Sequence, residues 1–137
     1  MSAKYTGGCL CGAVRFATDA EPVFTGNCHC KDCQRSTGGP FTPAMFFVAS
    51  AVNTTGQTSS FRSLADSGKY IERCFCPTCG SQLFSKLELL PGMLGIKAGT
   101  LDDAALFQPT VDIYVASAPH WDHMNPGLPK FDKGPPQ

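Results

Sequence analysis

Short stretches in which apolar and polar residues alternate recur along most of this chain. Most are bounded by Gly, Pro, Asn or Asp, which favour turns and end strands. Alternation of period two puts the apolar side chains on one face of a strand. The pattern therefore predicts a mainly β fold with strands over residues 5–9, 13–17, 22–26, 41–48, 60–63, 70–76, 82–86, 93–98 and 110–115.

Few windows have helical spacing, so only short helices are expected. One helical turn is predicted over residues 31–37, and another over 102–105 with Thr100 as its N-cap and Asp103 three residues later. The segment 119–137 contains five prolines and is predicted to lack regular structure. It also carries apolar residues that indicate partial packing on the body, and the predicted core is rich in phenylalanine. The residues concerned are Trp121, Leu128 and Phe131 in the tail, and Phe41, Phe46, Phe47, Phe61, Phe75 and Phe84 in the core.

Length and charge limit the possible functions. The 137 residues are expected to form a single domain, 1–137, long enough to bury a core. Lys and Arg total 11, as do Asp and Glu, so the formal net charge is zero. This excludes the strongly basic surface of a nucleic-acid binder and gives no general attraction to anionic membranes. No apolar run approaches the roughly 20 residues of a membrane-spanning helix. A homodimer is an expectation only, from the small size and many strand edges.

The eight cysteines are the main chemical signal. The N-terminal residues form no apolar signal segment, so a cytoplasmic protein with reduced thiols is expected. The cysteines fall into three closely spaced groups, which favours metal binding over disulfides. The groups are Cys9 and Cys11, then Cys28, Cys30 and Cys33, then Cys74, Cys76 and Cys79.

Seven or eight sulfurs exceed the needs of one tetrahedral metal, so two zinc sites are predicted. A C-x-C pair and a C-x2-C pair together supply four ligands, Cys9, Cys11, Cys76 and Cys79. Pro77 and Gly80 favour the tight turn that the second pair needs. Such a closed site would be structural, and its binding energy would contribute to folding.

The remaining group, Cys28, Cys30 and Cys33, is predicted to hold a second zinc with an open fourth position, as catalytic sites do. Three thiolates on a divalent ion leave a net charge of −1. That charge should blunt the acidification of bound water, whereas a soft substrate thiolate remains a suitable fourth ligand. The sequence therefore favours thiol chemistry over hydrolysis.

Several segments resemble motifs of the glutathione-dependent formaldehyde-activating enzyme family, which includes centromere protein V. The resemblance extends in the right order over nearly the whole chain. It is carried by residues 8–16, 28–38, 73–80, 99–103 and 128–135, which include all three cysteine groups.

The resemblance implies a β-tent fold of small packed antiparallel sheets around a structural zinc. It also implies a carbon–sulfur lyase or synthase reaction that joins glutathione and formaldehyde as S-hydroxymethylglutathione. Carried over by position, Cys9, Cys11, Cys76 and Cys79 match the structural zinc ligands, and Cys28, Cys30 and Cys33 match the catalytic ones. A non-catalytic zinc-binding interaction module and a zinc or redox sensor remain as alternatives.

Other residues have two interpretations each. Cys74 could close the second zinc site, but a buried thiol is favoured. His29 is predicted to point away from its neighbouring cysteines on an extended segment. Asp102 and Asp103 fit helix capping better than catalysis. The general acid or base is left open among water, Asp112, His120 and His123, and Arg35 is a candidate partner for a substrate carboxylate.

Overall fold

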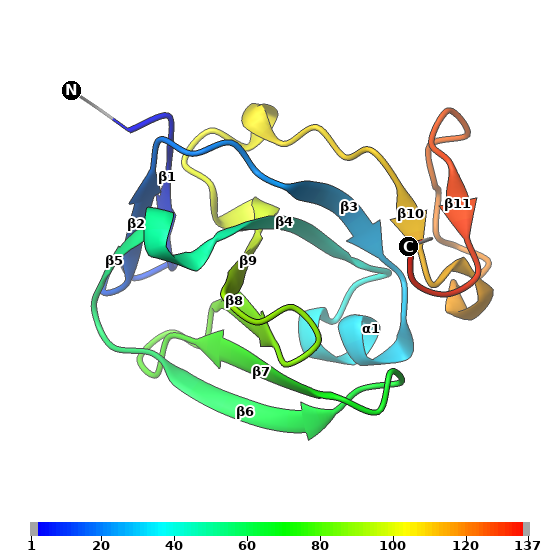
Figure 1. Cartoon of the computed structure of the whole chain (residues 1–137), viewed down its shortest axis with the longest axis horizontal. Helices are drawn as coiled ribbons and strands as arrows, with labels where there is room; N and C mark the ends of the chain where they lie inside the picture. The colour runs from blue at the N-terminus through cyan, green and yellow to red at the C-terminus, as the bar shows by residue number, and fades with distance from the viewer. Residues whose placement is uncertain (1–2, 136–137) are drawn as a thin grey trace.

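A computed structural model describes residues 3–135 (Figure 1). The fold is mainly β, as predicted. The strands are β1 (Tyr5–Gly8), β2 (Arg15–Thr18), β3 (Phe24–Cys28), β4 (Thr42–Val48), β5 (Asn53–Thr55), β6 (Ser59–Leu64), β7 (Tyr70–Phe75), β8 (Gln82–Leu87), β9 (Met93–Lys97), β10 (Asp112–Ile113) and β11 (Lys130–Phe131). The helical elements are α1 (Lys31–Thr37) and four 3₁₀ turns, η1 (Ala49–Ala51), η2 (Ala98–Thr100), η3 (Ala104–Leu106) and η4 (Val115–Ser117).

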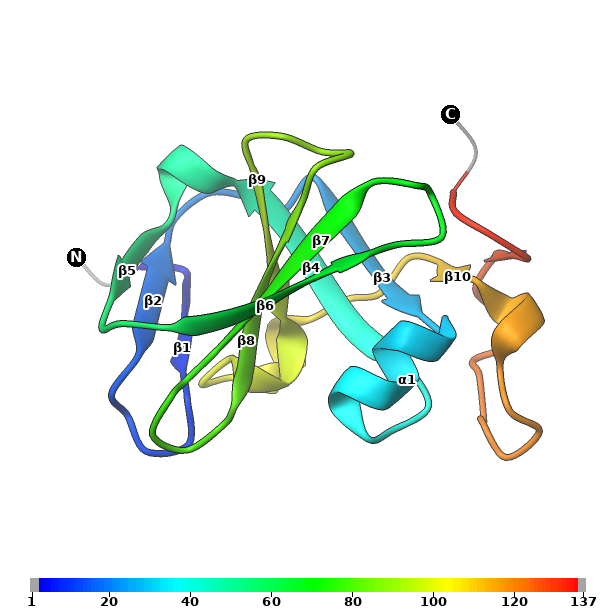
Figure 2. The same ribbon diagram turned by 90° about the horizontal axis from the view of Figure 1, so that it is seen from below.

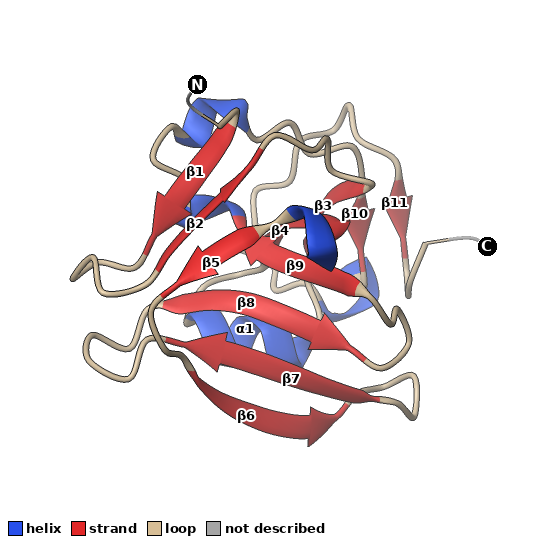
Figure 3. Ribbon diagram, turned by 60° about the vertical axis from the view of Figure 1, so that its left-hand side comes forward, coloured by secondary structure: helices blue, strands red, loops and turns tan. Residues whose placement is uncertain are grey.

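The strands form two sheets. The smaller has the order β1-β2-β5, and the larger the order β11-β10-β3-β4-β9-β8-β7-β6. All pairings are antiparallel except those of β10, which runs parallel to both β3 and β11. Figure 3 shows β6, β7 and β8 side by side with β6 at the edge, and Figure 2 shows α1 near the end of β3. Among the described residues, no helix is long and apolar enough to cross a membrane.

The core lies where the smaller sheet packs on one face of the larger one. Phe16 on β2 contacts Phe84 on β8 in an edge-to-face arrangement with ring centroids 5.9 Å apart. Tyr5 on β1 contacts Phe47 on β4 in the same way at 5.5 Å. Burial of each such side chain stabilises the fold by about 1.5–3 kcal/mol. These contacts hold the hairpin of β1 and β2, which carries two cysteines, against the larger sheet.

Alternation along the strands separates the core from a second, concave face of the larger sheet. On β4, Met45 and Phe47 are buried in the core, whereas Thr42, Ala44 and Phe46 face a cavity. The register aligns cavity-facing positions on neighbouring strands. Between β3 and β4, Cys28 lies opposite Thr42 and Gly26 opposite Ala44. Ala44 also lies opposite Lys97 on β9, and Arg73 on β7 lies opposite Ser85 on β8. The same period-two pattern that predicted the strands therefore builds the floor of the site.

The structure differs from the sequence expectations in several places. Strand β5 lies in a polar segment without apolar alternation, and β11 lies in the proline-rich tail, where regular structure was not expected. Pro136, part of that predicted tail, lies outside the described residues. Phe61, predicted to be in the core, is 65% exposed because β6 is an edge strand. Asp103, rather than Thr100, caps the short η3 turn by accepting from Ala105 N.

Candidate metal centre and cavity

The four cysteines expected to form a closed metal site lie together. Cys9 and Cys11 lie in the turn between β1 and β2, and Cys76 and Cys79 in the turn between β7 and β8. Their four sulfurs lie within 4.8 Å of one another. Cys11 Sγ is 3.7 Å from both Cys9 Sγ and Cys76 Sγ. Tetrahedral zinc–thiolate geometry requires sulfur separations of about 3.8 Å, so this cluster has the correct dimensions for such an ion.

Local backbone geometry directs donors to these sulfurs. Val14 N donates to Cys9 Sγ at 3.2 Å, and this hydrogen bond is the main cause of a lowered pKa at Cys9. The Ser81 hydroxyl lies 3.2 Å from Cys79 Sγ, and its hydrogen bond is the main cause of a Cys79 pKa of about 5. Gly80 adopts φ 78°, the left-handed conformation expected after the last cysteine of the turn. These contacts favour the thiolate forms that bind metals.

The three remaining candidate ligands form a second cluster. Cys28 ends β3, Cys30 caps α1, and Cys33 lies in the first turn of that helix, with all three sulfurs within 4.8 Å of one another. Cys33 N donates to Cys30 Sγ at 3.3 Å. Hydrogen bonds from Cys28 and then Cys30 lower the pKa of Cys33 to about 2. Among residues 3–135, no fourth cysteine, histidine or carboxylate joins this group.

Both clusters could therefore hold a metal ion, and they differ in completeness. The four-cysteine cluster offers a full tetrahedral set, whereas the three-cysteine cluster offers three sulfurs and one free direction. Cys74 belongs to neither. It is 2% exposed within the core, where burial raises its pKa, so the favoured interpretation as a buried thiol agrees with the structure.

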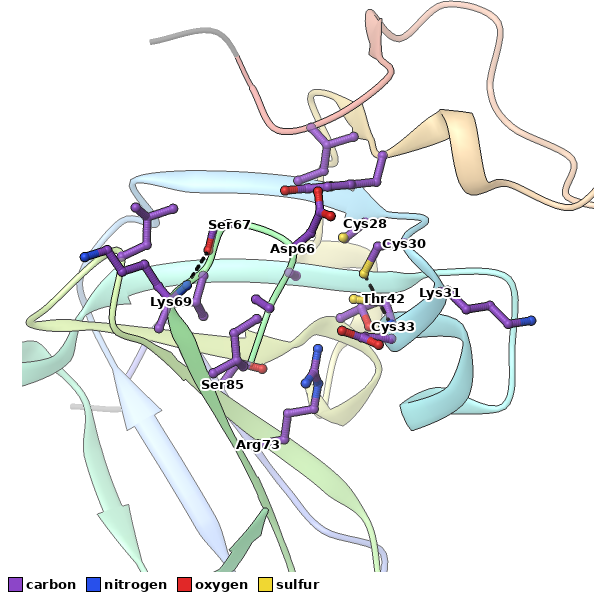
Figure 4. Close-up of a pocket in the computed structure, with 18 of the residues that line it drawn as sticks. Cys28, Cys30, Lys31, Cys33, Thr42, Asp66, Ser67, Lys69, Arg73 and Ser85 are labelled. Atoms are coloured by element: carbon purple, nitrogen blue, oxygen red, sulfur yellow. Dashed lines mark hydrogen bonds between the residues drawn. The ribbon is translucent and has the colours of Figure 1, made fainter. Parts of the chain in front are cut away.

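The three-cysteine cluster opens into a cavity of about 460 Å³ (Figure 4). Cys28, Cys30 and Cys33 line one side of it. The loop between β6 and β7 and the segment after β10 contribute other walls, including Asp66 and Tyr114. Tyr114 is the only residue other than glycine with positive φ (58°) within the described part of the chain.

Two buried cations that were not predicted from the sequence also line this cavity. Lys97 Nζ donates to Ser85 Oγ at 2.9 Å, and Arg73 Nη1 donates to Ser63 Oγ at 3.3 Å. Both residues are 8% exposed. Burial lowers the pKa of Lys97, while the nearby Cys33 charge raises it less strongly. A lysine in the otherwise apolar run Leu94–Ala98 is the signal that could have marked this position.

His29, which lies between two candidate ligands, points away from Cys28 and Cys30, as predicted. It is completely buried, and its Nε2 lies 2.8 Å from Asp112 Oδ1 while its Nδ1 contacts Asp122 Oδ2. Each ring nitrogen of His29 therefore has a carboxylate partner. Burial tends to raise the pKa of Asp112, but hydrogen bonds from His29 and Asn27 outweigh it and leave the pKa lowered.

Several candidate functional residues lie outside the cavity. Asp112 alternates with Ile113, so Ile113 faces the cavity and Asp112 faces His29. His120 and His123 are exposed and do not line the cavity. Arg35 is exposed in the last turn of α1 and does not line it either. Asp102 does not line the cavity either, and it binds Arg15 through two hydrogen bonds instead of capping a helical turn.

Comparisons with known proteins identify the fold and the family. Over 81 residues the chain is 30% identical to a Schizosaccharomyces pombe protein named as an uncharacterized lyase, with 59% of this chain and 56% of that protein aligned. The chain thus spans about half of that relative's length. A Rhodobacter sphaeroides crystal structure shares the fold, with a TM-score of 0.58, 18% identity, and 92% of this chain and 98% of that chain covered. Residues 4–117 match the profile of the glutathione-dependent formaldehyde-activating enzymes, and the chain belongs to that family.

Proposed function

We propose that this protein is a zinc-dependent carbon–sulfur lyase or synthase acting on the adduct of a thiol and a small aldehyde. The adduct formed by glutathione and formaldehyde is the model for this substrate. The observation that carries the proposal is the three-cysteine cluster, with one free ligand direction, in the wall of a cavity. Family membership and the lyase-named relative support the same class of reaction.

The proposed reaction is a reversible addition. The thiol sulfur forms a bond to the carbonyl carbon, the C=O π bond opens, and the thiol proton ends on the new hydroxyl oxygen. The reverse reaction breaks the C–S bond and regenerates thiol and aldehyde. A zinc ion held by Cys28, Cys30 and Cys33 would take the substrate sulfur as its fourth ligand and favour its thiolate form.

The residues of the chain supply position and environment for this reaction. Phe24, Phe46 and Leu87 give the cavity apolar walls that limit access of water. The Cys33 N–H donates to Cys30 Sγ, which fixes the orientation of that sulfur at the start of α1. Buried His29 is held by two carboxylates and fixes the chain between Cys28 and Cys30. With three anionic sulfurs, the site suits a thiolate better than it suits formation of hydroxide.

The four-cysteine cluster is proposed to hold a second zinc with a structural role. It joins a turn near the N-terminus to a turn about halfway along the chain, so its binding energy would stabilise the packing of β1 and β2 on the larger sheet. An interaction module with a closed second zinc is a weaker alternative. A flat apolar surface over Cys28, Cys30 and Cys33 would favour this alternative, whereas those three cysteines line a cavity.

The test is exchange NMR of glutathione and formaldehyde with their adduct, using zinc-loaded protein. Wild-type protein is expected to accelerate exchange, and Cys30→Ser to lose the acceleration. Cys74→Ala is the matched control, because it removes a thiol that lies outside both clusters. A Cys30→Ser variant as active as the wild type would refute the proposed role of the three-cysteine cluster.

A further inference from the structure

The charged residues around the cavity are strongly unbalanced. Five cations and two carboxylates line it: Lys31, Lys69, Arg73, Lys97 and Lys133 against Asp32 and Asp66. The whole chain, by contrast, has a formal net charge of zero. A concave site with an excess of positive charge concentrates anions. The charge distribution therefore indicates an anionic ligand.

The two innermost cations lack carboxylate partners. Arg73 and Lys97 are each 8% exposed, and neither forms a salt bridge with a carboxylate within residues 3–135. Each donates to a serine hydroxyl, which is neutral. A buried cation without an anionic partner is costly to the fold. The arrangement is consistent with a site whose counter-charge arrives with a ligand.

The cysteine cluster supplies only part of that counter-charge. Three thiolates around a divalent ion carry a net charge of −1, which balances one of the two cations. The other cation is left without a partner. The register places Arg73 opposite Ser85 on β8, and Lys97 hydrogen-bonds to that same Ser85 from β9. The two cations thus converge on one position of the cavity floor, and Figure 4 shows the Arg73 side chain projecting into the cavity.

We propose that Arg73 and Lys97 form a carboxylate-binding site beside the three-cysteine cluster. Arg73 supplies a planar guanidinium that can bind a carboxylate through two parallel hydrogen bonds, and Lys97 supplies a compact charge. This inference rests on the proposed function and narrows its substrate class to adducts that carry a carboxylate near the reacting sulfur. The carboxylate comes from either the thiol or the aldehyde.

The test compares ligands that differ only in charge, by calorimetric titration of zinc-loaded protein without oxygen. 3-Mercaptopropionate is expected to bind at least about tenfold more tightly than 3-mercaptopropionamide. This preference should fall to within about twofold in Lys97→Met and in Arg73→Gln, and remain in Lys97→Arg. Lys86→Met is the control, since Lys86 is an exposed residue of β8 that does not line the cavity.

A second pair, glyoxylate and uncharged glycolaldehyde, distinguishes the two sources of the carboxylate. A Lys97-dependent preference for glyoxylate alone would assign the carboxylate to the aldehyde. No charge preference in either pair would overturn the proposed site. Propionate has the carboxylate but no thiol, so it distinguishes failure of the carboxylate site from failure of the proposed lyase function. Lys97-dependent binding of propionate without binding of either thiol would support the carboxylate site and refute the thiol chemistry.

Discussion

Asp122, in the proline-rich tail, contacts His29, the residue between Cys28 and Cys30. The pair is separated by 93 positions in sequence, and both side chains are 1% exposed. Asp112 binds the other ring nitrogen of His29. Contacts from the tail therefore hold in place residues 28–30, which carry two of the three cysteines in the cavity.

Replacement of His29 by alanine should be strongly destabilising. It would leave Asp112 and Asp122 buried without their shared partner, at a cost of about 3–5 kcal/mol in the free energy of unfolding. Asp122→Asn keeps an acceptor and should cost less, about 1 kcal/mol. Urea unfolding measures both, with exposed His120→Ala as the control. Equal stability of His29→Ala and wild type would contradict the proposed fastening role.

The Arg15–Asp102 ion pair should make the stability of the fold depend on pH in the acid range. Hydrogen bonds from Arg15 and then Thr6 lower the pKa of Asp102 to about 2. The unfolded chain protonates this carboxyl near pH 4. The pair should therefore stabilise the fold fully above about pH 4 and lose its contribution as the pH falls through about 2. Thermal unfolding of wild type and Asp102→Asn should differ above pH 4 and converge below pH 2, while Asp132→Asn should follow wild type throughout.

The two cysteine clusters should respond differently to mutation. Cys76→Ser removes one sulfur from the four-cysteine cluster and should unfold the domain or lower its melting temperature by at least about 10 °C, because metal binding there is coupled to folding. Cys33→Ser should retain the fold and lose the metal of the cavity. Circular dichroism with zinc analysis measures both effects. A Cys76→Ser variant as stable as wild type would show that the first cluster has no structural role.

Lys97→Met should raise stability while weakening binding of an anion. Methionine has similar length and needs no counter-charge, so the free energy of unfolding should rise by about 1 kcal/mol when no ligand is present. Chemical denaturation of ligand-free protein measures this. A loss of more than about 1 kcal/mol would indicate that Lys97 stabilises the fold, and would weaken the case for an unpaired buried cation.

Most strands and the turns that carry the cysteine pairs could be predicted from the sequence, because both depend on patterns among neighbouring residues. The turns that carry Cys9 with Cys11, and Cys76 with Cys79, were recognised from spacing alone, and the structure brings their sulfurs together. Alternation also placed His29 on the opposite side from its neighbouring cysteines. These features depend on a few consecutive residues and on backbone geometry.

The pairing of Arg73 with Lys97 in one site could not be predicted from such local patterns. Arg73 and Lys97 lie on different strands, and only the register of β7, β8 and β9 brings both to Ser85. Phe61 was misplaced because the sequence does not show that β6 is an edge strand. Asp112 was a candidate general base, but the parallel pairing of β10 with β3 places its side chain against His29 and outside the cavity. Each of these outcomes depends on contacts between distant segments.

Native mass spectrometry of the purified protein tests the central claim most directly, because it counts metals and bound thiol on the same molecule. The wild-type chain should carry two zinc ions and bind one glutathione. The Cys30→Ser chain should keep one zinc and bind no glutathione, and Cys74→Ala should match the wild type. A Cys30→Ser chain that still carries two zinc ions, or binds glutathione as the wild type does, would contradict the assignment of the cavity cluster as the thiol-binding metal site.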